Sequence, residues 1–232
     1  MHDKPRAYLA AAPLQLAHVP TLTRTEGVRQ FLENPPSARS AGWDLRTLDR
    51  ASLVAGDRLR VSNGDRKSLD LLADGTFIAV AAFDGFLSWG PEALPEDPKI
   101  SGLALIEFTY EFVAFYARLA AEHIEPYPTR IRFEIGIHRA IFADGGGSET
   151  ALYLNPGAIN AFPPHVRMAA PEASFGHRQD LAVDPERGID VPVVAFDLVR
   201  RVYNWFGHLD DAIPYTTPDG RAIDIEAIKS VR

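Results

Sequence analysis

The sequence predicts an α+β fold in which an antiparallel or mixed sheet packs against two long helices. Alternating apolar and polar residues between 58 and 82, and again from 129 to 142, are typical of half-buried strands. Apolar residues recur at helical spacing over 103–122 and 191–206. We expect a single domain over residues 1–232, with one long irregular insertion at about 148–190.

The first elements are expected to be a strand and a short helix. The apolar run 7–16 predicts a buried strand. Thr23 and Glu26 have the spacing of a capping box, so a helix should begin there and end before Pro35. The segment 58–82 then predicts a three-stranded meander. Its second turn, Asp74-Gly75, is expected to be of type I′, in which both central residues have positive φ.

Two strong helices and a strand follow. Apolar residues cover more than one face of 103–122, so this helix should be buried on two sides. Glu107 and Glu111 lie one turn apart on it, and we expect them on a solvated face. Pro192 in the first turn and Gly207 after the last turn predict the limits of the helix 191–206. Asp219-Gly220 predicts a turn before a short element at 223–228.

Composition indicates a cytoplasmic bacterial protein. The apolar fraction of 46% and the charged fraction of 24% are those of a globular domain. There is no cysteine, which excludes disulfides and thiol chemistry, and no apolar run is long enough for a membrane span. We recognise no cofactor or metal motif in the sequence, and we predict neither. The net charge of −7 disfavours direct nucleic-acid binding.

Three groups of residues are candidates for function. A nucleic-acid-binding patch would use the only local basic cluster, which is Arg58, Arg60, Arg66 and Lys67. A hydrolase would use His208 as a general base with Asp210 or Asp211. A partner-binding surface would use the aromatic residues Trp89, Tyr203, Trp205 and Tyr215.

The order of elements resembles a known bacterial family. The aromatic helix at 103–122 leads into the strand at 129–142, and the chain closes with Phe196-Asp197, Trp205, Gly207, Tyr215 and Asp219-Gly220. This pattern is similar to the region downstream of the Schlafen-like, AlbA-type DNA-binding module. The acidic-lysine signature of that module does not occur here. The resemblance therefore transfers no catalytic residue, and it implies that a protein partner, or an N-terminal module that this chain lacks, completes the function.

These observations favour a non-catalytic accessory or sensor domain that binds a protein partner in a bacterial defence or regulatory system. The nucleic-acid-binding module and the hydrolase remain the two alternatives. Salt-dependent binding of DNA or RNA would support the first alternative. Loss of activity or of metal uptake on replacement of His208 would support the second.

Overall fold

The computed structural model describes residues 5–15, 21–39, 42–46, 50–54, 57–64, 66–82, 99–143, 147–155 and 168–231. Seven antiparallel strands form the main sheet in the order β12-β7-β1-β5-β4-β3-β2. They are β1 (Arg6–Pro13), β2 (Ser52–Val54), β3 (Arg58–Asn63), β4 (Lys67–Leu71), β5 (Phe77–Ala82), β7 (Arg130–His138) and β12 (Ser174–Ala182). Smaller sheets join β6 (Lys99–Ser101), β10 (Tyr153–Asn155) and β11 (Met168–Ala169), and β8 (Ile141–Ala143) with β9 (Glu149–Ala151).

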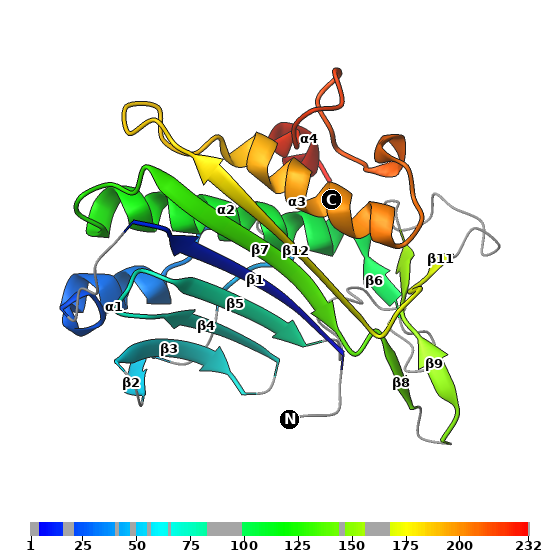
Figure 1. Ribbon diagram of the computed structural model, residues 1–232, viewed down its shortest axis with the longest axis horizontal. Coiled ribbons are helices and arrows are strands. Elements are labelled where there is room, and N and C mark those ends of the chain that lie inside the picture. The colour runs from blue at the N-terminus through cyan, green and yellow to red at the C-terminus, as the bar shows by residue number, and fades with distance from the viewer. Residues whose placement is uncertain are drawn as a thin grey trace.

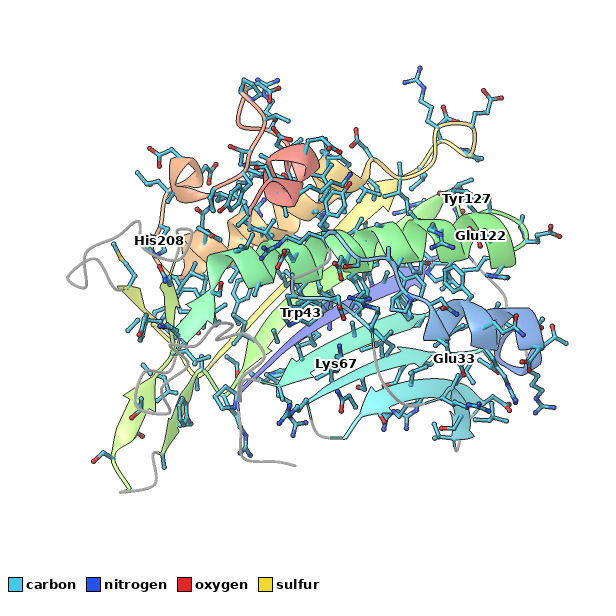
Figure 2. The ribbon with its side chains drawn as sticks, turned by 180° about the vertical axis from the view of Figure 1, so that it is seen from behind. Glu33, Trp43, Lys67, Glu122, Tyr127 and His208 are labelled. Carbon is cyan, nitrogen blue, oxygen red and sulfur yellow. The ribbon has the colours of Figure 1, made fainter. Side chains whose placement is uncertain are left out.

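The helices lie on one side of the main sheet. They are α1 (Glu26–Glu33), α2 (Gly102–His123), α3 (Val191–Trp205) and α4 (Ile225–Lys229). In Figure 1 the sheet faces the viewer and the long helices run behind it, whereas Figure 2 shows α2 in front of the sheet. The strand β6 pairs in parallel with β10, so the structure contains both antiparallel and mixed sheets. The predicted α+β class is confirmed.

The core lies between the sheet and α2. Alternate residues of β1, β5 and β7 point toward α2 and are buried, as strand periodicity requires. Phe77 stacks on Phe112 with ring centroids 5.3 Å apart, and Phe133 meets Tyr116 edge-on at 5.7 Å. A second side of α2 packs against α3. The predicted burial of α2 on two sides is therefore correct, and it explains why this helix is apolar almost all round.

The segment predicted as an irregular insertion contains a regular strand. Within 148–190, β12 pairs with β7 over its whole length of nine residues. Its side chains alternate between exposed and partly buried, because β12 is an edge strand with solvent near both faces. Only Phe175 and Leu181 are large apolar residues in it, so the sequence carries little strand signal there. Hydrogen bonding to β7, rather than the strand propensity of its own residues, therefore stabilises the extended conformation of β12.

Two local predictions are wrong. Gly75 has φ of +82° but Asp74 has no positive φ, so the turn is not of type I′. Hydrogen bonds from Gly75 N to Leu72 O and from Leu72 N to Thr76 O instead close a three-residue loop with glycine in the left-handed position. Thr23 lies buried in a 3-10 turn, and Thr25 occupies the N-cap position of α1 without a side-chain capping bond.

Candidate functional site on the outer face of the sheet

One face of the main sheet has no described helix across it (Figure 1). We call it the outer face. It consists of the side chains of alternate residues in β3, β4, β5, β1, β7 and β12 that point away from α2. The register places these residues opposite one another across the strands, for example Tyr8 opposite both Val80 and Gly136. Side chains far apart in the sequence therefore form one continuous surface.

This outer face is positively charged, although the chain carries a net charge of −7. Among the described residues it has seven arginines and three carboxylates, an excess of four positive charges. The arginines are Arg6, Arg58, Arg60, Arg66, Arg130, Arg132 and Arg178, and the carboxylates are Asp70, Glu134 and Asp180. The acidic residues that dominate the total charge lie elsewhere, so net charge is a poor guide to this surface.

Ion pairs between opposing strands orient several of these arginines. Arg60 Nε and Nη2 donate to the two carboxylate oxygens of Asp70 at 2.7 and 2.9 Å, and the two residues are directly opposed in β3 and β4. Arg132 makes the same two-point contact with Asp180 at 2.8 and 3.1 Å. The exposed Arg132–Asp180 pair adds little stability, but both two-point contacts fix the planes of the guanidinium groups.

A tyrosine lies near the middle of the outer face. The ring of Tyr8 lies directly over Gly136, since a Cβ atom there would come within 2.2 Å of the ring. The Tyr8 hydroxyl donates to Glu134 at 2.7 Å, and its ring stacks on His138 with centroids 4.9 Å apart. Burial, then the hydrogen bond to Glu134, raises the pKa of Tyr8 to about 12. Tyr8 therefore remains a neutral phenol at physiological pH.

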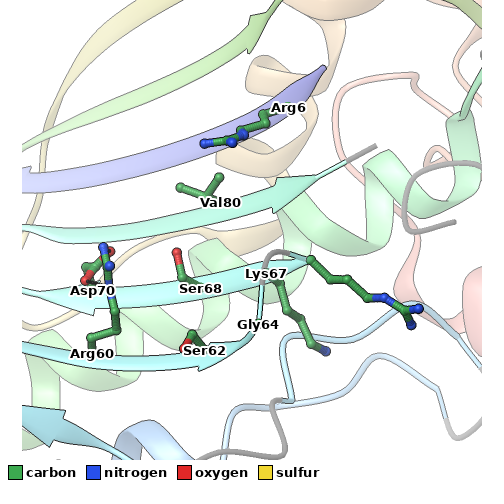
Figure 3. Close-up of a pocket in the computed structure, with 9 residues that line it drawn as sticks. Arg6, Arg60, Ser62, Gly64, Lys67, Ser68, Asp70 and Val80 are labelled. Carbon is green, nitrogen blue, oxygen red and sulfur yellow. Dashed lines mark hydrogen bonds and ion pairs between the residues drawn. The ribbon is translucent and has the colours of Figure 1, made fainter. Parts of the chain in front are cut away.

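A pocket of about 190 Å³ opens on the outer face (Figure 3). It is lined by Arg6, Arg60, Ser62, Gly64, Arg66, Lys67, Ser68, Asp70 and Val80. Ser62 and Ser68 are directly opposed in β3 and β4, and neither hydroxyl is hydrogen-bonded to a described residue. Arg6 and Arg66 likewise form no ion pair with a described residue. The pocket therefore offers polar donors that are not engaged within the described protein.

The predicted basic cluster is divided between the two faces of the sheet. Arg58, Arg60 and Arg66 belong to the outer face, whereas Lys67 points to the helix side, where its Nζ donates to the carbonyl of Asp44 at 3.0 Å. Figure 2 shows Lys67 on that side together with Trp43. Burial lowers the pKa of Lys67 despite the nearby Asp44 carboxylate. Lys67 also lines the pocket on the outer face, but its ammonium group is engaged on the helix side, as strand alternation requires, so the three arginines carry the charge of this cluster on the outer face.

The structure brings His208, Asp210 and Asp211 around one open depression. His208 is 7% exposed, and burial lowers its pKa against the opposing effect of a hydrogen bond to the Leu154 backbone. Its Nε2 has no partner among the described residues, and Asp210 pairs with Arg200 at 3.5 Å. Within the described chain, no hydrogen bond or ion pair joins the imidazole to either carboxylate. The arrangement thus lacks the contact by which a carboxylate orients a general base.

The predicted aromatic partner surface is not assembled. Tyr203 is completely buried, which contradicts its predicted contact with a partner, because the helical stripe that carries it faces the core. Trp205 packs on Phe175 with centroids 5.2 Å apart. Tyr215 is partly buried against the core. Trp89 lies outside the described residues.

Glu107 and Glu111 are buried rather than solvated, with exposures of 0% and 1%. Glu107 pairs with the guanidinium of Arg39 and accepts a hydrogen bond from Trp43 N at 2.9 Å. Glu111 accepts from Ala38 N at 2.6 Å and from Leu45 N at 3.1 Å. The two carboxylates thus fasten residues 38–39 and 42–45, which we call the strap, to α2. Their burial could have been inferred from the sequence, because the residues around Glu107 and Glu111 in this helix are mostly apolar.

The described residues also lack a metal cluster and a membrane-spanning helix. The described histidines, aspartates and glutamates include no group of three that could hold a metal ion. No helix in the described ranges is both long enough and apolar enough to cross a membrane. Comparison of the chain with family models, curated proteins and solved structures gives no match. The similarity to Schlafen-like proteins therefore stays a prediction.

Proposed function

We propose that the chain is a non-catalytic accessory or sensor domain of the bacterial cytoplasm, and that it binds single-stranded nucleic acid across the outer face. The observation that carries the proposal is the excess of four positive charges on the sheet face that no described helix covers, in a chain whose total charge is −7. Polyanions bind to such surfaces chiefly through phosphate neutralisation.

Arginine geometry supports a phosphate-bearing ligand over a generic acidic one. Arg60 and Arg132 are held in plane by two-point contacts with carboxylates, and Arg178 is fixed by Glu134 at 2.7 Å. An oriented guanidinium group can donate two parallel hydrogen bonds to a pair of phosphate oxygens, whereas a lysine ammonium acts as a mobile point charge. Every basic residue of the outer face is an arginine.

The dimensions and the aromatic groups favour a single strand. From β12 to β3 the face crosses five strand intervals, roughly 24 Å at about 4.8 Å each. This length suits about four nucleotides, the lower end of single-strand site sizes. Tyr8 and His138 lie between the two groups of arginines, where unstacked bases would meet aromatic rings.

The test measures binding of a labelled single-stranded 12-mer with hydroxyl ends by fluorescence anisotropy at several salt concentrations. The double variant Arg132→Gln/Arg178→Gln should weaken binding about tenfold and reduce the slope of log K against log salt by about 1.4. The control Arg118→Gln/Arg187→Gln removes the same charge from exposed arginines outside the face. Equal effects of the two variants, or no binding by the parent chain, would contradict the proposal.

Protein docking is a second candidate function, favoured by one observation. Leu209 is 74% exposed and Met168 is 41% exposed. Both residues adjoin Gly207. Gly207 and Leu209 line one depression, and the Met168 sulfur lies 3.1 Å from where a Cβ atom would be if residue 207 were alanine. Leu209→Ser should reduce partner recovery in a co-purification from the native host without altering nucleic-acid affinity. Unchanged recovery would exclude this corner as the docking surface.

A further inference from the structure

The pocket on the outer face has its own chemistry, distinct from the paired arginines around it. Its polar groups come from the strands β1, β3 and β4 and from the turn that precedes β4. Figure 3 shows Ser62, Ser68 and Val80 in line on three neighbouring strands, with Arg6 beside them and the Arg60–Asp70 pair at one end. The described lining thus combines guanidinium groups with two hydroxyls.

The charge of the pocket matches that of a doubly charged anion. Arg60 is neutralised by Asp70. Arg6 and Arg66 have no carboxylate partner among the described residues, which leaves two uncompensated positive charges. A terminal phosphate monoester carries about −1.5 to −2 at neutral pH, whereas a phosphodiester carries one negative charge. The hydroxyls of Ser62 and Ser68 are available as donors to its oxygens.

The size of the pocket limits what enters it. A volume of about 190 Å³ lies below the range of roughly 300 Å³ and more that is typical of sites for drug-sized ligands. A phosphate group fits, but a whole nucleotide does not. Val80 in the lining lies opposite Tyr8 in the register, although the Tyr8 ring extends the other way, over Gly136 of β7. A base attached to a phosphate in the pocket would therefore lie outside the pocket, on the outer face.

We propose that this pocket binds a terminal phosphate monoester, so that the domain recognises the phosphorylated end of a nucleic-acid strand. This inference rests on the proposed function and deepens it. Arg6 and Arg66 would neutralise the phosphate, and Ser62 and Ser68 would donate to it. Asp70 acts as a positioning residue, because it holds Arg60 in place at the pocket wall.

The experiment compares three labelled 12-mers of one sequence, carrying a 5′-phosphate, a 3′-phosphate or only hydroxyl ends. The parent chain should bind one phosphorylated end roughly tenfold more tightly than the hydroxyl-ended strand. The double variant Arg6→Gln/Arg66→Gln should lose this preference and bind the phosphorylated and the hydroxyl-ended strands with equal affinity. The control Arg118→Gln/Arg187→Gln should retain the preference, and thermal melting should confirm that both variants are folded.

The outcomes separate this inference from the proposed function. Equal binding of all three strands would refute recognition of a terminal phosphate by the pocket. Weaker binding by the Arg132→Gln/Arg178→Gln variant would still support nucleic-acid binding by the outer face. If the Arg6→Gln/Arg66→Gln variant still preferred a phosphorylated strand, the pocket could not be the site that recognises the phosphate. Nucleoside monophosphate or inorganic phosphate that raises the melting temperature of the parent chain, but not of this variant, would support the pocket even if no oligonucleotide binds.

Discussion

The same chemical pair, an arginine with a carboxylate, occurs in two opposite environments. On the outer face, Arg132 and Asp180 are 44% and 37% exposed. Under the strap, Arg39 and Glu107 are 4% and 0% exposed. Water screens the first pair and leaves it free to exchange partners, whereas the second is desolvated and must keep its partner. Burial therefore separates a surface suited to ligand exchange from a permanent internal attachment.

The largest expected effect comes from breaking the buried pair. Glu107→Gln removes the carboxylate that pairs with the buried Arg39 guanidinium and should lower the free energy of unfolding by about 3 to 5 kcal/mol. Urea denaturation followed by circular dichroism measures this loss. The matched control is Asp180→Asn, which breaks an exposed pair and should leave the urea midpoint unchanged. Similar shifts of the urea midpoint in the two variants would show that the buried pair and the exposed pair contribute equally to stability.

The second prediction concerns pH. Burial raises the pKa of Glu111 from 4.5 to about 8, against the opposing hydrogen bonds from Ala38 and Leu45. The native state therefore holds this proton more tightly than the unfolded state does. The corresponding stability is complete below about pH 4.5 and is lost as the pH rises toward 8, at up to about 1.4 kcal/mol per unit.

Urea denaturation of the parent chain and of Glu111→Gln at pH 5, 6, 7 and 8 tests this dependence. The variant cannot ionise, so the difference between the two unfolding free energies should change steadily with pH. A difference that stays constant across this range would show that Glu111 does not titrate as described. Histidines contribute to both chains, and their effect cancels in the subtraction.

The smallest effect concerns the steric requirement of the outer face. Gly136→Ala places a Cβ atom within 2.2 Å of the Tyr8 ring, so the ring must move and the variant should lose about 1 to 3 kcal/mol. Gly176→Ala is the control, because its Cβ atom would meet only the Tyr8 hydroxyl at 3.6 Å. Thermal or urea unfolding compares the two. A Gly136→Ala variant as stable as the control would mean that the ring is not fixed there.

Periodicity predicted the elements whose side chains face the core. The helix α2, the strand β7 and the meander from β3 to β5 all have regular apolar spacing, since each buries one face or more. The edge strand β12 was not predicted, because its side chains alternate only between exposed and partly buried. Its position depends on pairing with β7, which lies more than thirty residues earlier in the chain.

The candidate site was only partly predictable for a related reason. The cluster around residue 60 was visible in the sequence, but strand alternation sends Lys67 to the opposite face from Arg66. Arg6, Arg132 and Arg178 join the surface through the order of strands, which no local pattern encodes. Glu107 and Glu111 were assigned to solvent because the strap that covers them carries no recognisable secondary-structure pattern.

The central position of β1 sets an order of assembly for the outer face during synthesis. This strand lies between β5 and β7, although it is the first along the chain. All residues that line the pocket come from positions 6 to 80, whereas Arg130, Arg132 and Arg178 come after α2. A ribosome elongating from the N-terminus would thus release the complete pocket segment first. One edge of β1 would then stay unpaired until β7 is synthesised, and β7 and β12 would add their arginines to the face last.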